Sequence, residues 1–126
     1  MGEKFATIKH WNKDGQLTYS IGWKNNKYDG DLFDYYDNGQ VKMKARFVNG
    51  MVEGEAKSWY LSGKIKVIAY FILGAKTGKQ IEYFENGQIK ADFNMIDGKL
   101  DGEQKEYDET GKLIEDIFYK DGVPVK

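Results

Sequence analysis

The chain has no cysteine and a single proline, Pro124, among its 126 residues. Without cysteine there is no disulfide framework, no thiol nucleophile and no thiolate metal site. No apolar run approaches the roughly 18 residues that a membrane-spanning helix needs. Nineteen basic and twenty acidic residues leave a net charge of −1, so nothing in the charge balance favours nucleic acid. We therefore expect no nucleic-acid partner, and we expect no cofactor.

Glycine is abundant instead, and it recurs at a fixed interval of 24 residues. A fixed period in this range predicts a repeat protein, in which each unit packs mainly on its neighbours. We expect one repeat domain over residues 1–126, with a partial unit 1–14, full units 15–38, 39–62, 63–86 and 87–110, and a partial unit 111–126. Three glycine columns carry the period: Gly15, Gly39, Gly63, Gly87 and Gly111; Gly30, Gly54, Gly78 and Gly102; Gly50, Gly74, Gly98 and Gly122.

Each unit alternates apolar and polar residues, which predicts half-buried strands and no helix. In residues 41–47, Val, Met, Ala and Phe alternate with Lys, Lys and Arg. One predicted turn follows at Asn49-Gly50, and Asn26 in the same column favours a left-handed backbone there. The other turn fits a three-residue loop with a left-handed glycine, which places Tyr35 opposite Val41.

The predicted fold is all-β: an elongated, twisted antiparallel sheet of consecutive hairpins with about ten strands. Two aromatic or apolar columns are expected to share its packed face. They are Trp23, Phe47, Phe71, Met95 and Tyr119, and Tyr35, Trp59, Tyr83 and Tyr107. The first and last units are atypical, which predicts that they cap the sheet edges.

No pattern in the chain favours catalysis or metal binding. His10 is the only histidine, and an ordinary strand residue is the preferred interpretation. Acidic residues gather around one glycine column, and paired carboxylates can serve a glycosidase. Here the repeat itself generates the pairs, so we expect solvated turns, no metal site and no enzyme. The pairs are Asp29 and Asp31, Glu53 and Glu55, and Asp101 and Glu103, interrupted by Thr77 and Lys79.

Two further sets of side chains are candidate contact surfaces. Partly exposed aromatics often mark interaction sites. The equal alternative is that the aliphatic parts of lysine side chains cover these rings and leave no contact surface. Basic residues on a polar face suppress aggregation in most cases, but they can also contact anionic lipid. The predicted partner-binding set is Tyr36, Tyr60, Phe84 and Tyr70, and the predicted anionic-surface set is Lys42, Lys44, Arg46, Lys64, Lys66 and Lys90.

The pattern Phe47-Val-Asn-Gly50, Gly54, Trp59-Tyr60 and Gly63 resembles a MORN (membrane occupation and recognition nexus) repeat, in a variant form found in bacterial antitoxins. The resemblance implies a hairpin array without a catalytic centre that binds partners. For variant members it implies neutralising a toxin by direct protein contact. The alternative is a membrane-peripheral or cell-envelope scaffold on anionic lipid. We expect a monomer or weak homodimer. The sequence does not fix its location: the cytoplasm is slightly favoured, with secretion or the cell envelope as the alternative if a leader has been removed.

Overall fold

A computed structural model describes residues 4–125, and in this range the protein is one antiparallel sheet of consecutive hairpins without helices. The fold prediction is confirmed, with 13 strands instead of about ten, because short strands form beside the turns. They are β1 (Phe5–Trp11), β2 (Leu17–Lys24), β3 (Lys27–Tyr35), β4 (Val41–Val48), β5 (Met51–Val52), β6 (Gly54–Trp59), β7 (Ile65–Ile72), β8 (Ala75–Tyr83), β9 (Ile89–Ile96), β10 (Lys99–Leu100), β11 (Gly102–Tyr107), β12 (Leu113–Lys120) and β13 (Val123–Val125).

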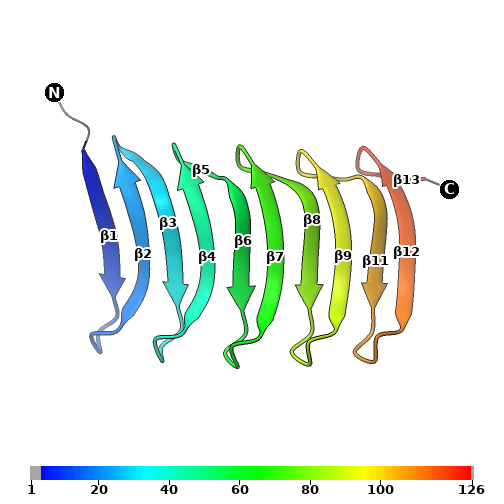
Figure 1. Ribbon diagram of the computed structural model, residues 1–126, viewed down its shortest axis with the longest axis horizontal. Helices are drawn as coiled ribbons and strands as arrows, with labels where there is room; N and C mark the ends of the chain where they lie inside the picture. Colours follow the sequence, from blue (N-terminus) through cyan, green and yellow to red (C-terminus); the bar gives the residue numbers. More distant parts are fainter. Residues whose placement is uncertain (1–3, 126) are drawn as a thin grey trace.

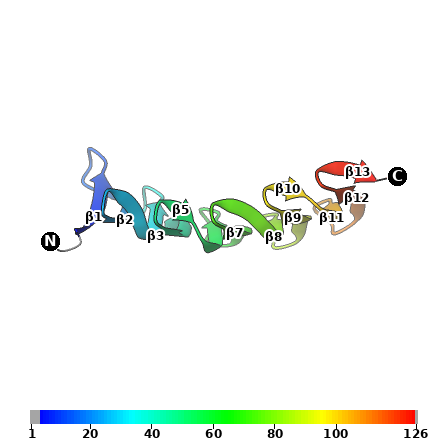
Figure 2. The same ribbon diagram turned by 90° about the horizontal axis from the view of Figure 1, so that it is seen from above.

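The strands stand side by side in chain order, so the sheet is long and one layer thick (Figures 1 and 2). The order is β1-β2-β3-β4-β6-β7-β8-β9-β11-β12-β13, with β5 paired to β4 and β10 paired to β9. Strands β1 and β13 lie at opposite ends of the row (Figure 1). Each hairpin therefore contacts only its neighbours, as expected for a repeat array.

Two kinds of turn alternate along the row. At one end of the strands, the two-residue turn Asn49-Gly50 has positive φ at both positions, 49° and 85°. This is the type I′ geometry, whose twist matches that of paired strands. Asn26 has a φ of 66°, which confirms the predicted left-handed position. At the other end the predicted three-residue loops occur, Gly39 has a φ of 88°, and Tyr35 pairs with Val41.

A bulge beside each three-residue loop changes which residues share a face. Tyr35 pairs with Val41 but Asp34 pairs with Met43, so Lys42 is an extra residue on β4. As a result Tyr35 stacks on Phe33, with ring centroids 6.3 Å apart, on the face opposite Met43. The prediction that Tyr35 lies on the same face as Phe47 is therefore wrong. The same shift recurs beside Trp59, Tyr83 and Tyr107.

The most buried residues all lie on one face, which we call the alanine face. They are Ile21, Ala45, Ala69, Ala91, Gln80 and Gln104. No second layer covers this face in the described chain, and no side chain there is completely buried. Small side chains are nevertheless shielded, which is expected on the inner side of a curved sheet, where neighbouring side chains close over them.

Candidate partner-binding surfaces

The predicted aromatic column joins each repeat to the next. The Tyr36 hydroxyl donates a hydrogen bond to the Trp59 carbonyl at 2.6 Å, and the Tyr60 hydroxyl donates to the Tyr83 carbonyl at 2.6 Å. Phe84 has no hydroxyl. One unit thus holds its neighbour at the three-residue loops, so these half-buried rings have a structural role whatever else they contact.

At the Phe84 loop, a different side chain makes the connection. Asn86 Nδ2 donates to the Glu109 carbonyl at 2.8 Å, again 23 residues along the chain. At the outermost loops the aromatic is replaced by Asn12 or Asp108, whose side-chain oxygen accepts N–H groups of its own loop instead. The hydroxyl of Thr110 donates to Asp108 as well, and it is the main reason that the pKa of Asp108 lies below its usual value.

The predicted basic residues do not form one stripe. Lys42, Lys66 and Lys90 are the extra residues of the bulges, and their ammonium groups lie over the rings of Tyr36, Tyr60 and Phe84 at 5.6–5.7 Å. Lys90 also forms an ion pair with Glu82, which is paired with Ala91, so this lysine lies on the alanine face. Lys44 lies over Phe33 on the opposite face, where Arg46 contacts Asp31. Lys64 is exposed in a loop.

The acidic column binds the turn of the next hairpin. Asp29 accepts the backbone N–H of Asn49 at 3.1 Å, and Asp101 accepts that of Asp121 at 3.1 Å. Thr77 interrupts the acidic pattern but keeps the contact, because its hydroxyl oxygen accepts the N–H of Asp97 at 3.2 Å. Glu53 does the same for Leu73 at 2.9 Å. These side chains thus support the turns, a role that the sequence analysis missed.

Nothing around His10 resembles a reactive centre. Its Nδ1 lies 2.8 Å from the Thr18 hydroxyl, and its ring stacks on Tyr19 at 5.2 Å. Within residues 4–125 there is no group of three or more potential ligand residues arranged to hold a metal ion. In that same range no helix is long and apolar enough to cross a membrane.

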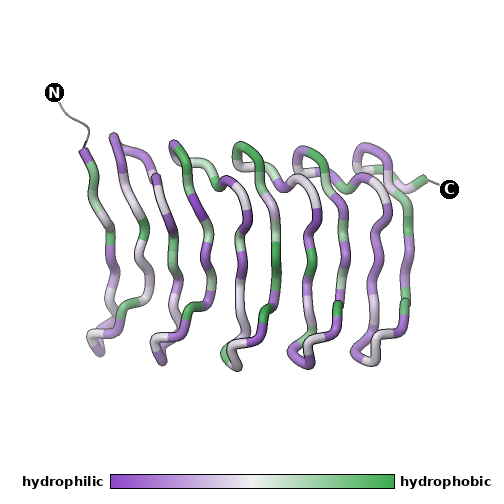
Figure 3. The backbone as a smooth tube through the Cα atoms, in the orientation of Figure 1, coloured by the Kyte–Doolittle hydropathy of each residue, from purple (hydrophilic) through white to green (hydrophobic). Residues whose placement is uncertain are grey.

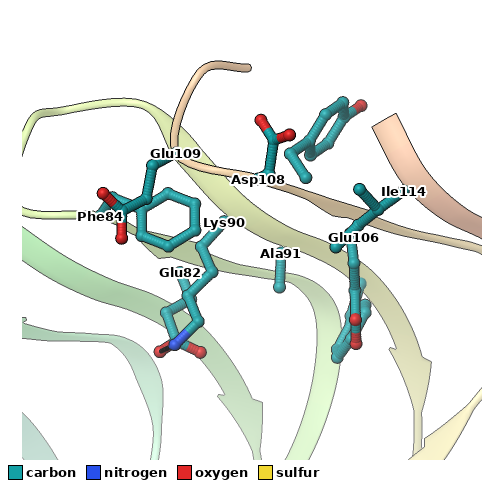
Figure 4. Close-up of a pocket in the computed structure, with 10 residues that line it drawn as sticks. Glu82, Phe84, Lys90, Ala91, Glu106, Asp108, Glu109 and Ile114 are labelled. Atoms are coloured by element: carbon teal, nitrogen blue, oxygen red, sulfur yellow. Dashed lines mark ion pairs between the residues drawn. The ribbon is translucent and has the colours of Figure 1, made fainter. Parts of the chain in front are cut away.

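A hollow of about 380 Å³ lies on the alanine face between the last two full hairpins (Figure 4). Ala91 and Phe84 line it, with Lys90 extending beside Phe84 toward Glu82. Glu106 lies on the far side. The ammonium group of Lys90 already contacts the Glu82 carboxylate and lies over the Phe84 ring. We therefore interpret this hollow as part of the contact between two repeats.

Strand β7 departs from the alternating pattern, because it is apolar on both faces (Figure 3). Ile68, Tyr70 and Ile72 point away from the alanine face, and Ile68 is paired with Ile81 of β8. With Leu73 at the turn, these five residues form what we call the β7 patch. All of them except Leu73 line a hollow of about 630 Å³ with mostly apolar walls. The patch includes Tyr70, the only predicted contact aromatic that is exposed.

Polar groups orient the aromatic ring of the patch. The Tyr70 hydroxyl donates to Glu55 Oε2 at 3.0 Å, and Lys57 contacts the other oxygen of Glu55 at 3.2 Å. The hydrogen bond from Tyr70, followed by that from Lys57, lowers the pKa of Glu55. The same bond raises the pKa of Tyr70. Across the hollow, Lys79 is paired with Asp92 at 2.9 Å. The patch is therefore an apolar centre with a charged, self-paired border.

Leu73, at the turn of this hairpin, is a second departure from the repeat pattern. Its φ is 48°, in the left-handed region, while its side chain is 74% exposed. The first position of the other type I′ turns is Asn25, Asn49, Asp97 or Asp121. A leucine is strained there and gains little burial in return. The replacement was visible in the sequence as an apolar residue in an Asn/Asp column, and the sequence analysis did not use it.

The chain was compared with known proteins. The family model described as MORN repeat variant matches it four times, at residues 28–49, 52–72, 76–97 and 100–121. The matches together span about two thirds of the chain. Each match begins just after one type I′ turn and ends at or beside the next, so it contains one three-residue loop and its two strands. No curated protein matches the chain.

Proposed function

The chain belongs to the MORN repeat variant family, and on this premise we propose that it is a non-enzymatic module that binds a partner protein through the β7 patch. The family assignment supports a repeat module, while the choice of surface depends on the structure. The non-enzymatic part of the proposal is supported by the acidic column, because carboxylates such as Asp29 and Glu53 are engaged in turn hydrogen bonds.

The exposed apolar character of one hairpin carries this proposal. Tyr70 is 39% exposed and Ile72 is 54% exposed, and Ile68 stands in a column that is polar in the other repeats, at Ser20, Lys44, Asp92 and Asp116. Interface centres combine an aromatic anchor with aliphatic neighbours, surrounded by a polar rim. The β7 patch has this composition, with Tyr70 as the anchor and Glu55, Lys57 and Lys79 in the rim.

The strained turn supports the same surface. A residue held in a sparsely populated conformation, with little side-chain burial to compensate for the strain, points to a function. Leu73 is such a residue, since asparagine would suit its backbone better and the side chain faces solvent. Together, Ile72 and Leu73 present an apolar edge at the tip of the hairpin.

We propose further that the partner is a toxin, which this chain neutralises as an antitoxin by direct contact. The support for this finer step is the likeness to variant MORN repeats of bacterial antitoxins. It predicts that the captured partner arrests growth when it is produced alone. Coproduction with this chain restores growth, and coproduction with a β7 patch variant does not.

The test is affinity capture from a lysate of the source organism with matched variants. Ile72→Ser combined with Leu73→Asn removes the apolar tip, and Val48→Ser makes a similar change one repeat earlier, at a residue that is also exposed. The wild type and Val48→Ser are expected to capture one protein near stoichiometrically, and the double variant to lose it. Equal capture by all three would refute the surface.

Membrane contact is the alternative function, and the arrangement of the basic residues does not favour it. Lys42 and Lys90 lie over aromatic rings, and Lys44 lies on the other face of the sheet from Lys90. Liposomes with anionic lipid separate the two functions, since surface attraction is screened by salt. Salt-sensitive co-sedimentation that Ile72→Ser and Leu73→Asn leave unchanged would favour the lipid function.

A further inference from the structure

The two outermost long strands each have an edge that the described chain leaves unpaired. Strand β1 pairs with β2 alone, and β13 covers β12 only at Phe118–Lys120. The rest of the outer edge of β12, over 113–117, has no partner among residues 4–125. Such edges present rows of free backbone N–H and C=O groups.

These two edges are complementary by topology. Strands β6, β8 and β11 follow a type I′ turn, and each pairs at that edge with the strand before the turn, namely β4, β7 or β9. Strand β1 is of the first type, since a three-residue loop joins it to β2, and β12 is of the second type. The free edge of β1 therefore lacks a strand that precedes a type I′ turn, which β12 is. The free edge of β12 lacks a full strand that follows such a turn, which β1 resembles.

We infer that residues 113–117 of β12, beyond the stretch that β13 covers, pair with residues 8–11 of β1 of a second copy, so that copies continue one sheet head to tail. The register follows from the chain itself. In the pairing of β9 with β11, Asp92 lies opposite Lys105 and Ala91 opposite Glu106. Asp116 stands 24 residues after Asp92, and Lys9 stands 96 residues, or four repeats, before Lys105. The same register thus places Asp116 opposite Lys9 of the second copy.

Charge complementarity favours this partner. Asp116 and Lys9 repeat the unlike-charge pair that Asp92 and Lys105 make inside the sheet. One position further along, the same register places Glu115 opposite His10 of the second copy, where no like charges meet. Directly opposite unlike charges stabilise a strand pair, and like charges destabilise it. Two copies of β12 would instead gather the carboxylates of Glu115 and Asp116.

The apolar residues of the two edges also match. Ile117 occupies the column of Ala45 and Ala69, which are 5% and 6% exposed, yet it is only half-buried at the edge. Ile8 occupies the column of Gln80, which pairs with Ala69 inside the sheet. The proposed register brings Ile8 of the second copy opposite Ile117, and each covers the other on the alanine face.

The contact is expected to be weak and open-ended. The loops beside it have Asn12 and Asp108, which hydrogen-bond within their own loops, where the internal repeats have the connecting Tyr36 and Tyr60. A head-to-tail contact joins two different surfaces and leaves one edge of each kind free at the ends of every assembly, so assembly grows with concentration instead of stopping at a dimer.

Sedimentation of the full chain over a range of concentrations tests this inference. Lys9→Glu and Asp116→Lys each place like charges opposite one another, so each is expected to weaken association roughly three- to tenfold. The combined Lys9→Glu/Asp116→Lys chain restores an unlike pair and is expected to recover it. Lys64→Glu and Asp37→Lys are control reversals at exposed loop residues far from both edges.

Several results would overturn the inference. They are a chain that stays monomeric at millimolar concentration, single variants that associate like the wild type, a combined variant that does not recover, or association that stops at a dimer. The β7 patch variant Ile72→Ser is expected to assemble normally. This outcome separates the edge contact from the proposed function, because the β7 patch variant loses partner capture only and the Lys9 or Asp116 variants lose self-association only.

Discussion

Replacing Leu73 by asparagine is expected to stabilise the protein while it removes part of its proposed binding surface. The left-handed conformation costs an ordinary L-residue about 1–2 kcal/mol, and asparagine adopts it more readily. The leucine side chain is 74% exposed, so roughly a quarter of its surface is buried. Burying a leucine fully contributes about 1.5–3 kcal/mol, so the lost burial amounts to about 0.4–0.8 kcal/mol.

The expected net gain is about 0.5–1 kcal/mol in the free energy of unfolding. In a domain of this size that corresponds to a rise of roughly 2–4 °C in Tm. Urea unfolding followed by circular dichroism measures it, with thermal unfolding as a second readout. Neither hydrogen bond of the turn is altered, because Leu73 donates to Glu53 through its backbone N–H and Gly74 donates to the Val52 carbonyl.

The chain offers its own control for this prediction. Asn49 takes the same place one repeat earlier, with a φ of 49°. Asn49→Leu is expected to destabilise the protein by about the amount that Leu73→Asn gains. If Leu73→Asn lowers stability, or if both substitutions change it in the same direction, the leucine is packed in a way that the exposed geometry does not support and the strain argument fails.

Three further predictions concern hydrogen bonds. Tyr36→Phe and Tyr60→Phe are each expected to cost about 0.5–1.5 kcal/mol in urea unfolding, and a change below 0.2 kcal/mol would show that the inter-repeat bond is not stabilising. Gln104→Ala is expected to cost about 1–3 kcal/mol by the same measurement, since it leaves the half-buried N–H of Asn94 in β9 unpaired, while the Asn94 carbonyl keeps the N–H of Asp101; a neutral result would mean that water replaces the side chain. Because the pKa of Asp108 is lowered in the folded state, its stabilising effect is present above its unfolded-state pKa and is lost as the pH falls through the folded one. An NMR titration of the Asp108 carboxyl should therefore show a midpoint below 3.8, and Asp108→Asn should flatten the acid limb of the stability curve.

The repeating hairpins could be predicted from the sequence because each is encoded locally. Alternation in residues 41–47 specified a strand, and Asn49-Gly50 specified its turn, without any knowledge of distant contacts. The pairing of Tyr35 with Val41 followed from the loop length alone. Periodicity at this scale averages over five copies, which makes the prediction robust to a departure in any one of them.

The faces could not be predicted in the same way. Period-two alternation assumes an uninterrupted ladder, and the extra residue Lys42 breaks it at a point that no residue type announces. The single shift moved Tyr36 to the alanine face, where its hydroxyl reaches Trp59. Its partner is a backbone carbonyl 23 residues away, and such a contact leaves no signature in the sequence of either residue.

The acidic column shows a related limit. A sequence analysis sorts residues by charge, so Thr77 counted as an interruption between Glu53 and Asp101. The structure uses only an oxygen that accepts one backbone N–H, which a hydroxyl provides as well as a carboxylate. An analysis of charge patterns therefore misses a hydrogen-bond acceptor such as the Thr77 hydroxyl, which carries no charge.

The position of β7 in the row has a consequence for how the molecule fluctuates. In the main order of the sheet, which leaves out β5 and β10, five strands lie on either side of β7, so β7 is the central strand of the described row. A linear array loses order from its termini inward, because the outermost hairpin has one neighbour and an inner hairpin has two. Among the described strands, Tyr70 and Ile72 therefore lie where opening is expected to be rarest.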